Sequence, residues 1–128
     1  MIQEDKDLLL KDLCARLPYG VKVECKWKTP APNGTYGMIC KLDSFLLDQI
    51  YNMNDSDVPF DEFKPYLFPM SSMTEEQRRE QEAYFICIKH DMSFSICRYM
   101  EWCYKNNLDV NGLIPKGLAI DATNENIY

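Results

Sequence analysis

Cysteine and histidine are the residue types in this sequence that could hold a metal ion. The candidates are Cys87, His90, Cys97 and Cys103. Thiolate and imidazole are both zinc ligands, and a set of this size would close a structural site. The interval between the last two cysteines, however, is an awkward offset for two side chains of one helix that must converge on an ion. We therefore predict no metal site and no cofactor, with buried thiols as the default.

The same residue types could serve nucleophilic catalysis, in which a thiolate works beside a base that a third group orients. His90 is the single histidine of the sequence. Its neighbours in the sequence do not identify a nucleophile and an orienting group that would lie next to it in space. We therefore predict that the protein is not an enzyme.

Basic and aromatic residues occur together in a set that could hold single-stranded nucleic acid. The set comprises Lys22, Lys26 and Lys28 beside Trp27, with Tyr19 and Tyr66 as further aromatic groups. A formal net charge of −6 and a sequence pI near 4.7 work against phosphate neutralisation. The strict alternation of residues 21–28 also favours a buried Trp27 with the lysines on the opposite face. A small-barrel module that binds single-stranded nucleic acid or a nucleotide-like ligand is therefore our alternative hypothesis.

Aromatic and methionine side chains held between prolines offer a surface for a protein partner. The candidate partner-binding residues are Tyr19, Lys64, Tyr66, Phe68 and Met70. Such groups make rigid contacts at a low cost in conformational entropy. Our first hypothesis for function is therefore a non-enzymatic protein-interaction module whose partner is unidentified.

The first half of the chain predicts one helix followed by strands. Apolar residues recur at helical spacing from Glu4 to Leu17, and Pro18 ends that pattern. Residues 21–28 alternate strictly between apolar and charged types, which indicates a strand covered on one face. A second strand is predicted from Tyr36 to Leu42, with Met38, Cys40 and Leu42 on one face.

The segment Phe45–Tyr51 is ambiguous between a strand and a helix. As a strand it completes a meander, and as a helix it places Leu46, Leu47 and Ile50 on one side. Periodicity cannot decide for so short an apolar run, and we favour the strand.

The stretch from Phe60 to Gln77 is the predicted junction between a β-rich half and a helical half. Pro65 and Pro69 interrupt its aromatic run, which favours an edge strand or a braced extended segment over a central strand. Thr74 and Gln77 have the spacing of a capping box, with Ser72 and Glu75 as a competing register.

Beyond the junction the pattern predicts two helices. The apolar run 83–88 is expected to continue the first helix into the core, although a strand is the alternative there. A second helix is predicted by the helical spacing of Ile96, Met100, Cys103 and their neighbours. The predicted fold is therefore α+β in a single domain, residues 1–128. It has an N-terminal helix, a small bent antiparallel sheet, with an SH3-like barrel as one form of it, and C-terminal helices.

Length and composition agree with that fold class. The chain has 128 residues, of which 46% are hydrophobic and 12% aromatic, enough for one sizeable core. No apolar run approaches the length of a membrane span, and the acidic start of the sequence has no apolar signal core. We therefore expect a cytoplasmic protein whose six cysteines are reduced and mostly buried.

Three stretches, taken in order, resemble a family of short uncharacterised proteins of gut bacteria and their prophages and mobile elements. The stretches are Lys11–Gly20, Lys64–Glu76 and Gly112–Ala119. This sequence departs from the family pattern at Phe68, where the family carries arginine, so a charged contact at that point does not carry over. The resemblance implies a bacterial or phage-derived cytoplasmic setting and brings no activity with it.

Overall fold

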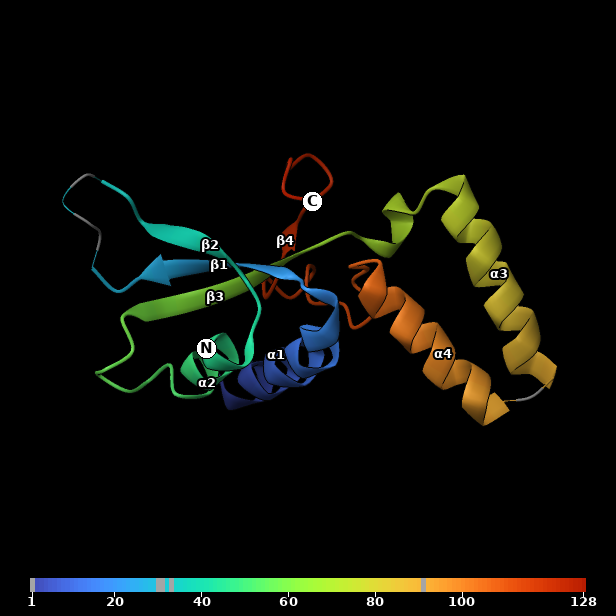
Figure 1. Ribbon diagram of the computed structural model, residues 1–128, viewed down its shortest axis with the longest axis horizontal. Coiled ribbons are helices and arrows are strands. Elements are labelled where there is room, and N and C mark those ends of the chain that lie inside the picture. Colours follow the sequence, from blue (N-terminus) through green and yellow to red (C-terminus); the bar gives the residue numbers. More distant parts are fainter. Residues whose placement is uncertain (1, 30–31, 33, 91) are drawn as a thin grey trace.

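The first half of the chain builds most of a sheet with two helices on one of its faces, and the second half extends from it as a helical hairpin before its last strand joins the sheet (Figure 1). The structure is a computed structural model that describes residues 2–29, 32, 34–90 and 92–128, with the backbone alone for 92–94. Its helices and strands are α1 (Gln3–Arg16), β1 (Lys22–Trp27), β2 (Gly37–Lys41), α2 (Ser44–Tyr51), β3 (Phe60–Leu67), α3 (Glu75–His90), α4 (Met92–Lys105) and β4 (Ile120–Asp121), with short 3-10 turns at Leu17–Tyr19 and Met70–Ser72. The α+β class with an N-terminal helix and C-terminal helices is confirmed.

The sheet is open and mixed, with strand order β2-β1-β3-β4 in the described residues. β1 pairs antiparallel with β2 and with β3, whereas β3 pairs parallel with β4 through Tyr66–Ile120 and Leu67–Asp121. The prediction of an antiparallel sheet with an SH3-like barrel as one form is wrong on both points. Because β2 and β4 lie at opposite edges, they do not pair with each other to close the sheet.

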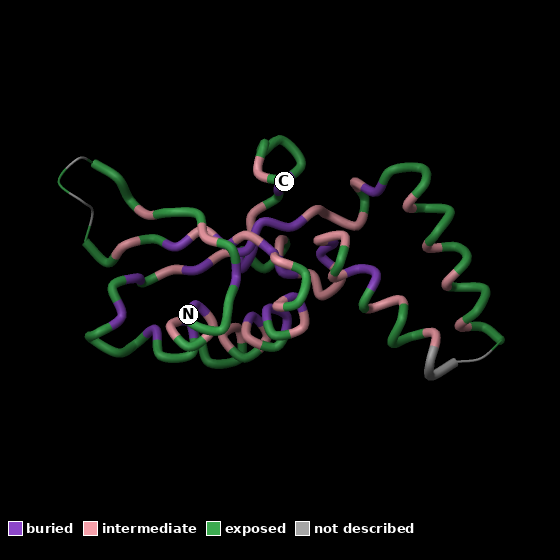
Figure 2. Tube along the Cα trace, in the orientation of Figure 1, coloured by how far each residue is buried: buried purple, intermediate pink, exposed green. Residues whose placement is uncertain are grey.

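The main core lies between the inner face of the sheet and the two helices α1 and α2 (Figure 2). Leu9 and Leu13 of α1 are buried there against Val23 of β1 and Phe63 of β3. The predicted helix and both predicted strands of the first half are confirmed. Apolar residues of α1 and β1 reach this core at the expected period, whereas no residue of β2 itself is buried.

The segment Phe45–Tyr51 is helical, so the favoured strand prediction is wrong and its helical alternative is right. The Asp43 carboxylate accepts a hydrogen bond of 2.8 Å from the Leu46 backbone N–H and so caps the first turn. Leu46 and Ile50 are buried in the core. The Asp43 cap and the two buried apolar residues at helical spacing therefore explain why this segment is a helix, which periodicity alone could not predict.

β3 lies between β1 and β4, but β4 pairs with it only at Tyr66 and Leu67. The prediction of an edge or braced segment is therefore right for residues 60–65 and wrong for the last two residues of the strand. The Leu67 carbonyl accepts from the Ala122 N–H at 2.8 Å, on the side of β4. Successive residues of a strand direct their backbone groups to opposite edges, so Pro65 and Leu67 face the same edge. The N–H that Pro65 lacks would therefore have faced the side of β4, away from β1. β4 begins only opposite Tyr66, so the proline leaves no β1 acceptor unpaired.

α3 begins at the predicted capping box. The Gln77 N–H donates to the Thr74 hydroxyl oxygen at 3.1 Å, and the Thr74 N–H donates to the Gln77 side-chain oxygen at 3.0 Å. The competing register is not used, since the Ser72 hydroxyl donates to the Pro69 carbonyl at 2.7 Å. The run 83–88 continues the helix, as predicted.

That run does not enter the core, and this part of the prediction is wrong. Phe85 and Ile86 are exposed, and no described residue of α3 is fully buried. The reason is the hairpin geometry, in which α3 packs mainly on α4 and projects away from the sheet (Figure 1). Among the described residues, α3 therefore packs mainly through the face that meets α4, and the apolar residues on its other faces stay exposed.

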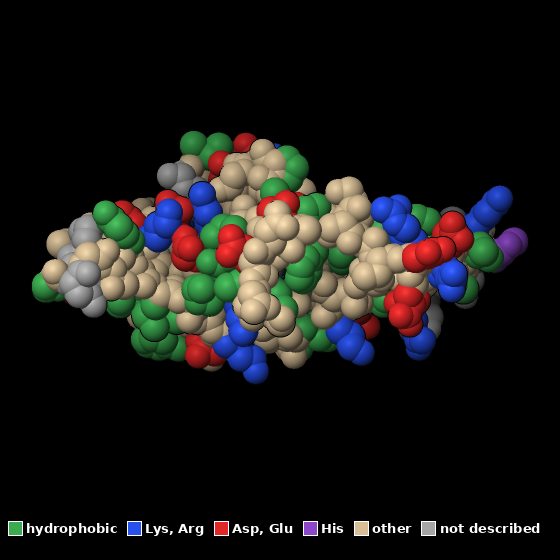
Figure 3. Space-filling model, turned by 90° about the horizontal axis from the view of Figure 1, so that it is seen from above, with side chains coloured by type: hydrophobic (Ala, Val, Ile, Leu, Met, Phe, Trp, Pro, Cys, Tyr) green, Lys and Arg blue, Asp and Glu red, His purple; other side chains and the backbone are tan. Residues whose placement is uncertain are grey.

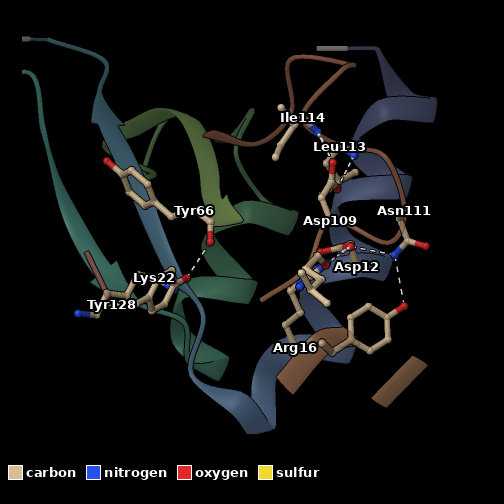
Figure 4. A network of polar contacts seen from close by, with 11 residues as sticks. Asp12, Arg16, Lys22, Tyr66, Asp109, Asn111, Leu113, Ile114 and Tyr128 are labelled. Carbon is tan, nitrogen blue, oxygen red and sulfur yellow. Dashed lines mark hydrogen bonds and ion pairs between the residues drawn. The ribbon is translucent and has the colours of Figure 1, made fainter. Parts of the chain in front are cut away.

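A buried polar network joins α1 to the chain that returns from the hairpin (Figure 4). The Arg16 side chain, fully buried, pairs with Asp12 at 2.6 Å and donates to the Leu108 carbonyl at 2.7 Å. Asn111 donates to the other Asp12 oxygen at 2.8 Å, and the guanidinium lies over the Tyr104 ring, 5.0 Å from its centroid. Arg16 and Asp12 are thus buried side chains of α1 that connect it to the returning chain.

Candidate functional site

The edge strand β2 presents open main-chain hydrogen-bonding groups. The Tyr36 carbonyl accepts from the Trp27 N–H at 2.7 Å, and the Leu42 N–H donates to the Val21 carbonyl at 2.8 Å. Even-numbered residues of this strand therefore face β1, and the alternation directs Gly37, Ile39 and Lys41 to the open edge. Among the described residues, none hydrogen-bonds to the backbone of those three on that side.

Exposed apolar side chains flank the same edge. Tyr36 is 70% exposed, Met38 45% and Ile39 48%. The register with β1 places Met38 opposite Cys25 on the inner face and Ile39 opposite Glu24 on the outer face. The Lys41 side chain is turned back over Gly20, where its Cε lies 2.8 Å from the point that a Cβ would occupy. The edge strand therefore presents an apolar side chain on each of its faces, and its own cation, Lys41, is directed toward Gly20.

A hollow of about 260 Å³ adjoins the edge on its outer side. It is lined by Tyr36, Gly37, Met38 and Ile39 of the edge and by Glu24 and Lys26 of β1. Gly37 is required here by close approach, because a Cβ at this position would lie 2.0 Å from the Cys25 carbonyl oxygen. An open ladder of backbone groups beside a side-chain hollow is the arrangement that receives an added strand.

The opposite edge of the sheet differs, because β4 pairs over two residues only and the chain after it crosses the outer face. The Tyr128 hydroxyl bridges two strands there, accepting from the Lys22 N–H at 2.9 Å and donating to the Tyr66 carbonyl at 2.8 Å (Figure 4). The Tyr66 side chain is 4% exposed. Burial and the hydrogen bond to Glu24 raise the pKa of Tyr66 to about 12.

The five predicted partner-binding residues lie in different surroundings. Lys64 stands on the outer sheet face and pairs with Glu62 at 3.2 Å, next to the buried Tyr66. Phe68 is half-buried, with its ring 5.7 Å from that of Tyr128, and Met70 packs on the apolar cluster of the hairpin. Tyr19 lies apart from them, in a cleft beside α4.

That cleft has a volume of about 520 Å³ and runs between Tyr19 and the helical hairpin. Tyr84 and Trp102 supply further aromatic walls, and Arg98, Glu101 and Lys105 supply charge. The Trp102 indole N–H donates to Glu80 at 2.8 Å, so its polar atom is already satisfied. Mixed charge and satisfied polar groups leave this cleft with no particular ligand chemistry.

The predicted metal candidates do not converge. Cys103 is fully buried, whereas Cys87, Cys97 and His90 are exposed on the hairpin. Within the described ranges, no group of three or more histidine, cysteine or acidic side chains could hold a metal ion.

The expectation that most cysteines are buried is wrong. All six cysteines lie within the described residues and none forms a disulfide, but Cys14, Cys87 and Cys97 are exposed. Two of these, Cys87 and Cys97, lie on the projecting hairpin at exposed positions of α3 and α4. Cys25 fits the expectation, since burial first and the neighbouring Cys40 second raise the pKa of its thiol to about 12.

The basic residues of the nucleic-acid hypothesis are engaged within the protein. Lys26 approaches Glu62 at 3.6 Å and Glu24 at 3.8 Å, and acidic and basic side chains alternate over this face (Figure 3). Lys22 and Lys28 donate to backbone carbonyls at 2.8 Å. Trp27 stacks on Phe60 with ring centroids 4.5 Å apart, as its predicted place on the inner face implies.

Sequence reasoning missed the open edge, although the sequence carries a signal for it. From Thr29 to Cys40 there is no charged residue. Proteins usually place charges, prolines or bulges on an exposed edge strand, and here the prolines precede the strand. No described helix is long and apolar enough to cross a membrane.

In the comparisons with known proteins, no family model, curated protein or solved structure matches this chain. The family resemblance drawn from the three sequence stretches therefore stays a prediction.

Proposed function

We propose that this chain is a non-enzymatic protein-interaction module that binds an extended polypeptide segment along the open edge of β2. The observation that carries the proposal is the coincidence of three open backbone positions, Gly37, Ile39 and Lys41, with exposed apolar side chains on both sides of them. In this mode main-chain hydrogen bonds supply affinity, and pockets for alternate side chains supply specificity. The hollow lined by Tyr36 and Ile39 is suited to the second task.

The charge around the edge favours a polypeptide over a nucleic acid. Lys26, the cation nearest to the hollow, already pairs with Glu24 and Glu62. The ladder carries one cation, Lys41, which is little for phosphate neutralisation, whereas its open backbone groups match the main chain of any extended peptide. The proposed setting, which rests on the family resemblance, is a bacterial cytoplasm.

The cleft at Tyr19 is a second surface for the same function. Tyr19 is the member of the predicted partner-binding set that lines an open cleft beside exposed parts of α4. A partner that contacts both surfaces would lose affinity on Tyr19→Ala and on edge substitutions independently.

The test is a selection of displayed peptides against the immobilised protein, repeated with Ile39→Lys and with Ile86→Lys. Both isoleucines are exposed, at 48% and 61%, but the second lies on the outside of α3. We expect the selection to yield peptides that bind both the wild type and the Ile86→Lys variant. The affinity of these peptides for Ile39→Lys should be lower by at least about tenfold, or about 1.4 kcal/mol.

Peptides that bind all three proteins equally would contradict an edge site. Single-stranded oligonucleotides are included at several salt concentrations, and tight, salt-dependent binding of these alone would favour the nucleic-acid hypothesis instead.

A further inference from the structure

We infer that the segment which pairs with β2 is the β2 strand of a second copy of this chain, antiparallel, with Ile39 on the two-fold axis. This inference rests on the proposed edge-binding function and names its occupant. The inference can fail while the proposed function holds, because the β2 edge could bind a segment of another protein without pairing with a second copy of this chain.

The hydrogen-bonding register of β2 is complementary to itself. Its outward-facing residues, Gly37, Ile39 and Lys41, are symmetric about Ile39. A two-fold antiparallel pairing centred there sets Ile39 opposite Ile39 of the second copy and Gly37 opposite Lys41 of the second copy. In an antiparallel ladder, residues that both direct their backbone groups to the shared edge form the hydrogen-bonded pairs. Every backbone N–H and C=O that β2 directs to its open edge then has a hydrogen-bond partner in the second copy.

The side chains fit the same register. Met38 falls opposite Cys40 of the second copy at a non-hydrogen-bonded position, where side chains approach most closely. Lys41 falls opposite a glycine, so its long side chain meets no like charge and no side chain across the pair. The exposed Met38 and Ile39 would both be covered, which gives the apolar free energy for the association.

The other exposed strand, β4, cannot play this role. It pairs over two residues, and the chain that follows it occupies the adjoining outer face through Tyr128. β3 also lacks a β4 partner from Phe60 to Pro65, but that stretch contains the charged Asp61 and the proline Pro65, which has no N–H, and both disfavour strand pairing. β2 is therefore the open edge suited to pairing, and the sheet would extend across the dimer from β4 of one copy to β4 of the other.

The length of β2 sets the expected affinity of the two copies for each other. An interface of stable complexes buries about 1,200–2,000 Å² in total, and two five-residue strands bury less than that. We therefore expect a reversible dimer that forms in the micromolar range and dissociates on dilution, not an obligate dimer.

The experiment is sedimentation velocity on the full chain over a concentration series, for the wild type, Ile39→Lys and Ile86→Lys. We expect a monomer–dimer equilibrium for the wild type and for Ile86→Lys. Ile39→Lys sets two ammonium groups opposite each other on the axis and is expected to weaken dimerisation at least about tenfold. Thermal unfolding of each variant establishes that the substituted chains are folded.

Isotope-filtered nuclear Overhauser spectra of a mixture of labelled and unlabelled protein test the register. Contacts between Ile39 and Ile39, and between Met38 and Cys40, of different copies are expected. A wild-type protein that stays monomeric at all concentrations would overturn the inference, as would a dimer that Ile86→Lys weakens as much as Ile39→Lys does. If the wild type stays monomeric while selected peptides still bind the edge, this inference fails and the proposed function stands. If neither occurs, both fail.

Discussion

The sheet half and the helical hairpin both expose large apolar side chains, but they differ in what lies beneath those side chains. On α3 and α4, Phe85, Ile86 and Ile96 stand on helices whose internal backbone groups are bonded within each helix. On β2, Met38 and Ile39 flank backbone groups that are open. The difference teaches that apolar exposure alone does not single out a candidate binding site, whereas apolar exposure beside open backbone groups does.

The two regions also differ in how they are held. The sheet half has a core formed by α1, α2 and the inner face of the sheet, while the hairpin has a small cluster around Trp102 and Cys103. The buried pair Asp12–Arg16 lies where the two meet, since Arg16 donates to Leu108 just after α4. We expect the hairpin to open locally before the sheet half unfolds.

The largest expected effect comes from removing that connection. Arg16→Met leaves Asp12 as an uncompensated buried charge, and we expect a loss of about 3–5 kcal/mol in the free energy of unfolding. The measurement is urea unfolding followed by circular dichroism. Asp7→Asn, at an exposed position of the same helix, is the control and should change stability by less than about 0.5 kcal/mol. A loss below about 1 kcal/mol in Arg16→Met would contradict the role given to the pair.

The two cores should respond differently to truncation. Leu13→Ala removes a fully buried side chain of the sheet half and should cost about 2–5 kcal/mol. Tyr84→Ala removes a half-buried ring that packs on Tyr99 and Trp102, and should cost less and be felt mainly in the hairpin. Unfolding midpoints and residue-resolved amide exchange measure both. Equal and global losses would show that the two regions form one cooperative unit.

A smaller effect is expected at the start of α3. Thr74→Ala removes the cap acceptor of the Gln77 N–H and should cost about 1 kcal/mol. Faster amide exchange should appear in the first turn of α3 and leave β1 unchanged. Thr74→Ser retains the hydroxyl and is expected to behave like the wild type, so an equal loss in both variants would argue against capping.

The last effect is expected only at high pH. The pKa of Tyr66 is about 12 in the folded protein against 10.0 for an ordinary tyrosine, so the unfolded chain ionises first as pH rises. Its contribution to stability is complete below pH 10 and is lost between about pH 10 and about pH 12. Urea midpoints of the wild type and Tyr66→Phe across this window test it, and the wild type should lose more. Cys25 acts in the same direction in both proteins.

Local signals in the sequence predicted those elements whose determinants are local. The alternation of residues 21–28 yielded β1, and Thr74 with Gln77 yielded the start of α3, because period and capping depend on neighbours in the chain. Placement depended on distant residues. The interior position of the last two residues of β3 requires Ala122 to reach Leu67, and nothing near Pro65 in the sequence contains that information.

The candidate site was missed for a related reason. The aromatic run around Tyr66 has the composition of a contact surface, but the chain after β4 covers it in three dimensions. The uncharged run before Cys40 looked like an ordinary second strand, and its open edge follows only from the strand order. Composition thus led to the hypothesis of protein binding, and topology leads us to propose a different place for it.

The central claim is that β2 receives a strand, and residue-resolved amide hydrogen exchange tests it most directly. In dilute protein, the amides of Gly37, Ile39 and Lys41 should exchange fast while those of Met38 and Cys40 are protected by β1. At high protein concentration, or with a selected peptide, protection should appear at the three odd positions. Slow exchange at all five positions in dilute protein, or no added protection at the odd positions under either condition, would contradict the account.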